Sequence, residues 1–113
     1  MNWAKSHQVK AATIVSCVGS LQKIHLRLAG GHQAVVFKGP QEIVSLVGTF
    51  SALGGHFHIS LADDRGQVIG GHLLEGNLVY TTAELVILEM TDQEFTRELD
   101  EQTGYQELKI KLR

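Results

Sequence analysis

Proline, cysteine and aromatic residues are scarce in this chain of 113 residues, which has one proline, one cysteine and 6% aromatics. The single cysteine, Cys17, excludes a disulfide bond within the chain. It lies in the apolar run of residues 11–18, and no neighbour in the sequence would lower its pKa, so we expect a buried, inert thiol. No apolar run approaches the roughly 20 residues that cross a bilayer, and no charged-then-apolar leader opens the sequence. These absences predict a cytoplasmic protein without a membrane segment.

A strong excess of charge of one sign is also missing, because ten Lys and Arg residues nearly balance twelve Asp and Glu residues, and the formal net charge is −2. A strongly electrostatic DNA-binding protein normally has a basic face and a high pI, whereas the pI here is about 6.3. A modest basic stripe is formed by Lys23, His25 and Arg27, which alternate along a predicted strand. Such a stripe is usually a solvated face. DNA is therefore a weakly supported partner.

Twelve glycines, and short β-branched segments separated by turn residues, favour many strands joined by tight turns. A chain of this length forms one domain, residues 1–113, with a self-supporting core. We expect Gly39-Pro40 to turn the chain, residues 2–8 to be the last turns of a helix, and Asp92 to cap a short helix over residues 92–100. Strands are expected over residues 11–18, 21–28, 34–37, 42–52, 54–61, 67–74, 80–90 and 105–112. The predicted fold class is α+β, dominated by a mostly antiparallel β-sheet with a helix packed on it.

Three histidines have a spacing that a β-hairpin would turn into a metal site. Residues two apart on a strand share a face, so His56 and His58 point away from the apolar residues between them. His72 follows in the next strand-like run. Imidazole suits Zn, Ni, Cu and Fe, with zinc the first choice at ligand distances of about 2.0–2.1 Å, and three protein ligands would leave one coordination position open. The alternative is that these histidines are ordinary polar residues on a solvated sheet face.

The metal site depends on the turn between the two strands. Residues 63–66 have turn composition, and a three-residue loop over 64–66, with Gly66 in the left-handed conformation, would place His58 directly opposite His72. All three histidines would then share one face, with directly opposed Cβ atoms roughly 4.5–5.5 Å apart. A loop of two or four residues would turn His72 to the other face. The sequence therefore predicts a register as well as a metal site.

The sequence around these histidines resembles the plants and prokaryotes conserved (PPC) domain. The resemblance is carried by Gly-Gly-His-Phe-His-Ile-Ser-Leu-Ala-Asp at residues 54–63, Gly-Gly-His-Leu at 70–73 and Gly-Asn-Leu-Val-Tyr-Thr-Thr-Ala-Glu at 76–84. Supporting matches at residues 17–21 and 100–108 extend it over nearly the whole chain. It implies a compact antiparallel sheet with a helix packed on it, assembled as a homotrimer. It also implies a poorly defined function, because prokaryotic members are labelled predicted DNA-binding proteins, largely through their plant relatives.

The chain departs from the family pattern in several places. It has no Arg-Gly-Arg-Pro AT-hook, the element that would enter the minor groove in the plant proteins. The plant stretch Gly-Arg-Phe-Glu-Ile-Leu appears at residues 39–44 without its arginine and its aromatic residue. Plant domains lack the three histidines, whereas prokaryotic members resemble this chain there and have the residues to hold a metal. Family members usually begin with a strand and most of a helix before Met1, so either the sequence begins late or this version dispenses with an edge strand.

A catalytic role would need a general base near the metal, and the carboxylates close in sequence are Asp63, Glu75 and Glu84. We expect Asp63 to cap its own turn, and Glu84 to lie at a subunit interface or in a turn, so no residue is predicted to be catalytic. The remaining histidines, His7, His25 and His32, are expected on the surface. The sequence therefore favours a binding or regulatory module. The alternative is a metal-dependent enzyme or a small-ligand sensor that uses the open coordination position.

Overall fold

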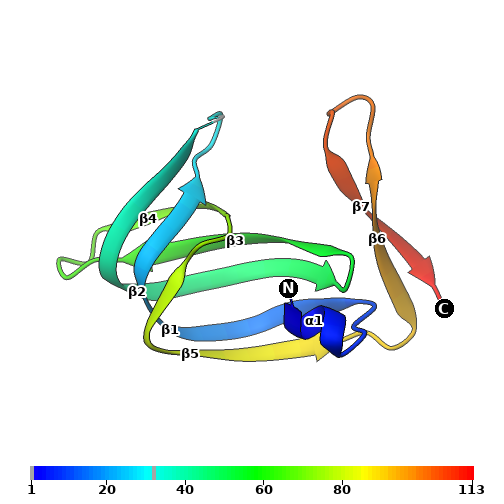
Figure 1. Ribbon diagram of the computed structural model, residues 1–113, viewed down its shortest axis with the longest axis horizontal. Coiled ribbons are helices and arrows are strands. Elements are labelled where there is room, and N and C mark those ends of the chain that lie inside the picture. Colours follow the sequence, from blue (N-terminus) through cyan, green and yellow to red (C-terminus); the bar gives the residue numbers. More distant parts are fainter. Residues whose placement is uncertain (1, 32) are drawn as a thin grey trace. The chain divides into compact units, whose positions relative to one another are not determined.

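The arrangement of strands is seen in a computed structural model that describes residues 2–31 and 33–113 (Figure 1). Within these residues one short helix, α1 (Asn2–Ser6), precedes seven strands. The strands are β1 (Ala12–Arg27), β2 (Ala34–Ser51), β3 (Gly54–Ala62), β4 (Val68–Leu73), β5 (Leu78–Glu89), β6 (Gln93–Leu99) and β7 (Gln106–Leu112). Five of them form a sheet in the order β2-β3-β4-β1-β5, and β6 and β7 form a separate antiparallel pair. The expectation of a mostly antiparallel sheet is confirmed, and the helical part of the described chain is one short helix.

The first two strands are longer than predicted because two expected breaks do not occur. β1 runs through Gly19, whose φ is 156°, and joins the segments expected at residues 11–18 and 21–28. β2 runs through Gly39-Pro40, where the sequence predicts a turn. Gly39 lies so close to β1 that an added Cβ atom would overlap the carbonyl oxygen of Leu21. This glycine therefore permits a close approach of two strands instead of a turn.

The prediction of a helix over residues 92–100 is wrong, because this segment forms β6. β6 pairs antiparallel with β7 over its whole length. In the turn between them the amide of Gln102 donates a hydrogen bond to Asp100 Oδ1, and Gly104 adopts a φ of 76°. A partner strand only a few residues away outweighs the weak helix signal, and Asp92 caps no helix.

Among the described residues, no helix is long and apolar enough to cross a membrane.

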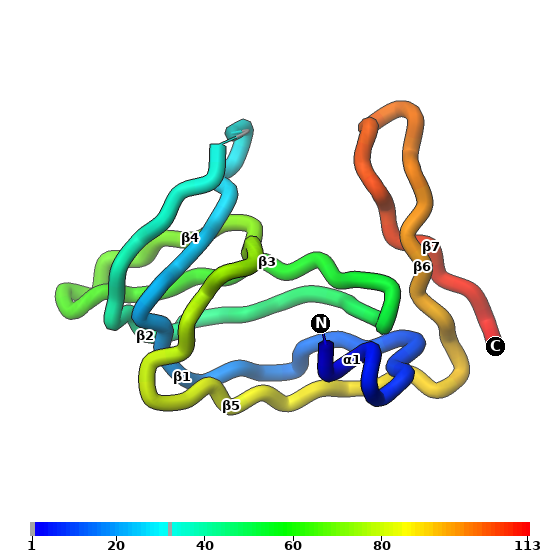
Figure 2. Tube along the Cα trace, viewed as in Figure 1, coloured from blue at the N-terminus to red at the C-terminus, as the bar shows by residue number. Residues whose placement is uncertain are grey.

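Residues 14–48 and 56–86 form one compact unit. In this unit β2 also pairs with β1, so β2, β3, β4 and β1 make a closed ring of neighbouring strands, and the end of β1 runs beside the start of β2 in Figure 2. Its core is Leu21, Ile24, Leu26, Ile59 and Leu61, each at most 5% exposed. Polar residues alternate with these side chains along β1 and β3. The opposite face of the same strands therefore carries the polar groups.

Residues 2–13, 49–55 and 87–113 belong to a second unit. Backbone hydrogen bonds join its separate segments. The amide of Ala52 donates to the carbonyl oxygen of Val9, and the amide of Phe95 donates to the carbonyl oxygen of Lys10. Phe50 and Phe95 are buried and supply the aromatic part of its core. Backbone hydrogen bonds and buried aromatic side chains therefore hold these three segments in one unit.

Two strands with long apolar runs, β1 and β5, expose apolar side chains. In β1, Val15 and Val18 are 60% and 64% exposed, and in β5 Val86 and Leu88 are 55% and 54% exposed. β5 stands last in the sheet order, so within the described part of the chain one of its edges is unpaired. Cys17 is likewise half-buried instead of fully buried, although its burial still raises the pKa of its thiol.

Candidate metal centre

The turn between β3 and β4 has the predicted form. Gly66 adopts the left-handed conformation at a φ of 77°, and its amide donates a hydrogen bond to the carbonyl oxygen of Asp63. Oδ1 of Asp63 accepts hydrogen bonds from the amides of Arg65 and Gln67, each at 2.9 Å. Asp63 therefore caps its own turn, as expected, and the loop has three residues.

This loop length sets the register of the hairpin. The pairing of β3 with β4 runs from His58 opposite His72 to Ala62 opposite Val68. His56 precedes His58 by two residues on β3, so it projects from the same face. The predicted register is confirmed, and the three histidines share one face of the sheet.

The three imidazole rings converge. Their centroids lie 4.9 Å apart for His56 and His72, 5.1 Å for His56 and His58, and 5.8 Å for His58 and His72. One ligand nitrogen from each ring lies within 4.8 Å of the other two. Nitrogens bound to one tetrahedral ion at about 2.0–2.1 Å are roughly 3.4 Å apart. Rotation of the exposed rings of His56 and His58 would close that difference, so the donor set fits a metal ion.

His72 has an environment suited to a metal ligand. Its Nδ1 atom is buried and has no hydrogen-bond partner among the described residues. A buried polar atom without a partner costs about 1–3 kcal/mol, and coordination of a metal ion through this nitrogen would remove that cost. Desolvation lowers the pKa of His72, and the neighbouring charges of Arg27, His56 and His58 lower it further. The neutral imidazole thus favoured is the form that binds a metal.

Two glycines allow β4 to bring His72 into this position. Cβ atoms added to Gly70 and Gly71 would lie 2.7 Å from the carbonyl oxygens of Ile59 in β3 and Arg27 in β1, respectively. Both distances are shorter than real Cβ contacts, so β4 is held between its two neighbours at a spacing that only glycine permits. The Gly-Gly pair before His72 is therefore part of how the site is built.

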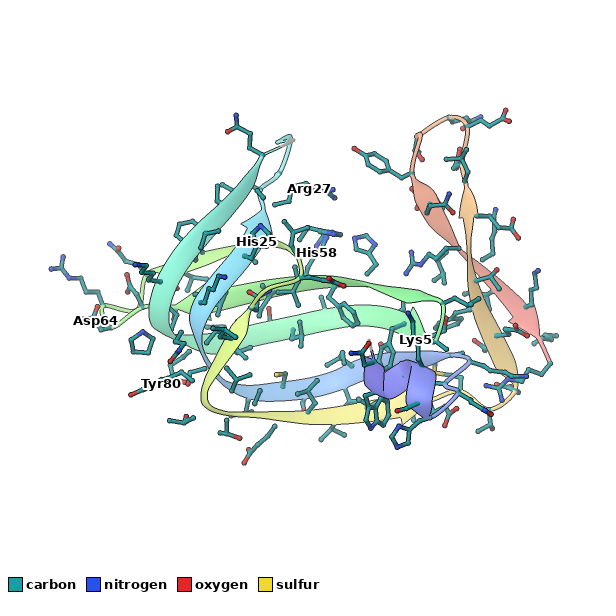
Figure 3. All side chains as sticks on the ribbon, viewed as in Figure 1. Lys5, His25, Arg27, His58, Asp64 and Tyr80 are labelled. Atoms are coloured by element: carbon teal, nitrogen blue, oxygen red, sulfur yellow. The ribbon has the colours of Figure 1, made fainter. Side chains whose placement is uncertain are left out.

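Arg27 also belongs to the histidine face. The pairing of β1 with β4 places Arg27, which Figure 3 labels near the end of β1, directly opposite His72. Alternation along β1 puts Arg27 on the polar face, but it does not indicate which strand lies beside it. No turn joins β1 to β4, so nothing in the local sequence reveals this pairing.

The other histidines lie outside the cluster or outside the described residues. His25 was expected on the surface, but it is half-buried. Its Nδ1–H donates a hydrogen bond to the carbonyl oxygen of Glu75. His7 is exposed directly after α1 and stacks on Trp3, with ring centroids 4.7 Å apart. His32 lies outside the described residues. None of these three replaces a member of the predicted set.

The cluster of potential ligands in the described chain contains no carboxylate. Asp63 is occupied in the turn, and the side chains of Glu75 and Glu84 are exposed. The geometry therefore offers three nitrogen ligands on one face of a sheet. Such a set can hold a divalent ion and leave one position for water or another ligand.

Comparison with known proteins identifies the family. The solved structure of a hypothetical protein from Salmonella enterica matches 99% of this chain and 81% of its own, with a TM-score of 0.96 and 38% sequence identity. The family model of the Plants and Prokaryotes Conserved (PCC, also written PPC) domain matches residues 1–91. The chain belongs to the PCC domain family. The resemblance seen in the sequence is thereby confirmed.

A curated relative matches this chain over a small part of its own length. The bifunctional protein GlmU of Synechococcus sp. strain JA-2-3B'a(2-13) is 41% identical over 107 residues. These residues are 95% of this chain but 17% of that protein. The chain therefore spans about a sixth of the length of this relative.

Two further solved structures share the PCC fold. A protein from Archaeoglobus fulgidus, described as metal-containing, matches 93% of this chain and 78% of its own, with a TM-score of 0.72 and 27% identity. A protein from Bacteroides thetaiotaomicron, named for a proposed DNA-binding role, matches 96% of this chain and 78% of its own, with a TM-score of 0.79 and 19% identity. At 19% identity the second likeness shows the fold alone.

Proposed function

We propose that this PCC domain is a binding or regulatory module in which His56, His58 and His72 hold a divalent transition metal ion. The proposal is carried by the convergence of three imidazoles on one sheet face, one of them with a buried nitrogen that has no partner among residues 2–31 and 33–113. The metal-containing relative from Archaeoglobus fulgidus supports it. Zinc is the first choice, because three imidazole ligands and one open position are typical of zinc, although copper, nickel and iron suit the same ligands.

A second candidate function is a metal-dependent enzyme or a small-ligand sensor. The feature that favours it is the coordination position that three histidines leave open. Zinc bound in such a site polarises a ligand at that position and lowers the pKa of a bound water to about 7. Either function would use the same metal centre, so the metal is the first thing to test.

Zinc content measured by elemental analysis tests the centre. Wild type and His58→Ala are loaded with zinc and dialysed, beside the controls Ser60→Ala, on the same strand, and His7→Ala, a histidine outside the cluster. Wild type and both controls should retain stoichiometric zinc, and His58→Ala should lose most of it, because two imidazoles bind far more weakly than three. Equal zinc in wild type and His58→Ala would refute the proposed site.

The homotrimer that the family resemblance implies is also part of the proposal. Its support is the exposed apolar surface of Val15 and Val18 on β1 and Val86 on the edge strand β5, which a neighbouring subunit would cover. Native mass spectrometry should find a species of three times the 12.4 kDa chain mass. A Val86→Glu variant should shift the protein to monomer. A wild type that is monomeric at all concentrations would contradict this assembly.

DNA is the candidate macromolecular partner, in a cytoplasmic setting. The support is the description of the Bacteroides neighbour and the stripe of Lys23, His25 and Arg27. Phosphate contacts make affinity fall as salt rises, so duplex DNA should be titrated with the protein at several salt concentrations. A salt-dependent affinity would favour DNA, and no binding at low salt would leave the sensor or enzyme ahead.

A further inference from the structure

Arg27 faces the proposed metal centre from the neighbouring strand. Antiparallel pairing puts it directly opposite His72, and directly opposed side chains project from the same face with Cβ atoms roughly 4.5–5.5 Å apart. Figure 3 labels Arg27 near the end of β1. Arg27 therefore projects from the sheet face that carries the three imidazoles, although its sequence position is remote from theirs.

The guanidinium of Arg27 is not neutralised within the described chain. Arg27 is half-buried, and its side chain makes no hydrogen bond or ion pair with the described residues. A half-buried cation without an anionic neighbour is a ready partner for a ligand of negative charge.

The charges around the cluster point the same way. Imidazoles bind a metal in their neutral form, and the cluster contains no carboxylate, so a divalent ion bound there would keep its full charge. The charge of Arg27 would add to that of the ion at the open coordination position. Its planar fork of N–H donors matches carboxylate and phosphate oxygens, which it binds through paired hydrogen bonds.

We propose that Arg27 and the open coordination position together form a binding site for small oxyanions of the carboxylate or phosphate class. The inference rests on the proposed metal centre. One oxygen of the anion would bind the ion, and the guanidinium would donate hydrogen bonds to another. The ligand of the sensor, or the substrate of the enzyme, would accordingly carry a carboxylate or phosphate group.

Cobalt(II) in place of zinc tests this site, because the visible absorption of four-coordinate cobalt changes when its fourth ligand is exchanged. The cobalt-loaded protein is titrated with inorganic phosphate and, separately, with acetate, in a buffer free of other oxyanions. Three variants are compared with the wild type. Arg27→Gln loses both the positive charge and the guanidinium donors, Arg27→Lys keeps the charge alone, and Lys23→Gln is the control. Lys23 lies on the same face of β1 and its replacement changes the net charge equally, so it is the matched control.

Phosphate or acetate should change the wild-type spectrum at saturable concentrations. The affinity should fall at least about tenfold in Arg27→Gln, as expected for the loss of a charge-assisted hydrogen bond, and less in Arg27→Lys. Lys23→Gln should match the wild type. Cobalt bound equally by wild type and Arg27→Gln, with equal anion affinities, would overturn the role of Arg27 and leave the metal centre standing. No cobalt bound by the wild type would overturn the metal centre itself.

The two anions separate the classes of ligand. Tighter binding of phosphate would assign the site to phosphorylated compounds, and tighter binding of acetate would assign it to carboxylic acids. A wild-type spectrum that neither anion alters would overturn the inference. Arg27→Lys could lose the spectral response to anions because it lacks the guanidinium or because its sheet is misfolded. Its far-ultraviolet circular dichroism and its cobalt content distinguish these two causes.

Discussion

Replacement of Gly71 by alanine tests how β4 positions its histidine. The Cβ atom of Gly71→Ala would stand 2.7 Å from the carbonyl oxygen of Arg27, whereas ordinary contacts begin at 3.4 Å. β4 must therefore move away from β1 by about 0.7 Å, the difference between these distances. It cannot simply move toward β3, because the position of Gly70 is equally crowded by the carbonyl oxygen of Ile59.

Such overpacking costs about 1–3 kcal/mol of unfolding free energy. For a domain of this size each kcal/mol lowers Tm by roughly 4 °C, so we expect a decrease of about 4–12 °C. The displaced backbone also carries His72 away from its position opposite Arg27. Zinc affinity should then fall by about tenfold, the lower range seen when groups that orient a metal ligand are disturbed.

Thermal unfolding in the presence of a chelator measures the first effect without a contribution from bound metal. Competition with a chromogenic chelator measures the second. Gly31→Ala is the control, because its added Cβ meets its nearest atom at 3.3 Å, close to ordinary contact, and its backbone has no positive φ. A Gly71→Ala protein with the Tm and zinc affinity of the wild type would refute the close approach of these strands.

Three further predictions concern local features. Asp63→Ala removes the acceptor of two turn hydrogen bonds and should lower the free energy of unfolding by about 1 kcal/mol in urea titrations; unchanged stability would show that the turn needs no cap. Gly66→Ala places a side chain at a residue in the left-handed conformation and should lower the free energy of unfolding by about 1–2 kcal/mol in the same assay. An unchanged free energy of unfolding would show that the loop has another conformation. Burial raises the pKa of Cys17, so less thiolate is present near neutral pH and iodoacetamide should react more slowly than with free cysteine, and faster as pH rises. Equal alkylation rates for the two thiols would contradict the burial of Cys17.

The hairpin that carries the histidines could be predicted because its determinants are local. Asp63 and Gly66 specify the turn, the turn specifies the loop length, and the loop length specifies that His58 faces His72. Each step needs only a few adjacent residues. Arg27 could not be placed in the same way, because it joins the site through a pairing between strands that no turn connects.

The incorrect predictions have different causes. Residues 92–100 carry a weak helix signal, but pairing with β7, the next strand along the chain, decides their conformation. Gly39-Pro40 has the composition of a turn, yet Gly39 serves the close packing of β2 on β1, a strand that is distant in sequence.

X-ray absorption spectroscopy of the zinc-loaded protein tests the central claim most directly, because it measures the ligands of the ion itself. We predict three imidazole nitrogens at about 2.0–2.1 Å, with the scattering of whole rings, and one further nitrogen or oxygen ligand. His58→Ala should lose one imidazole contribution. A wild-type spectrum with oxygen ligands alone, or with the same imidazole scattering after His58→Ala, would contradict a centre formed by His56, His58 and His72.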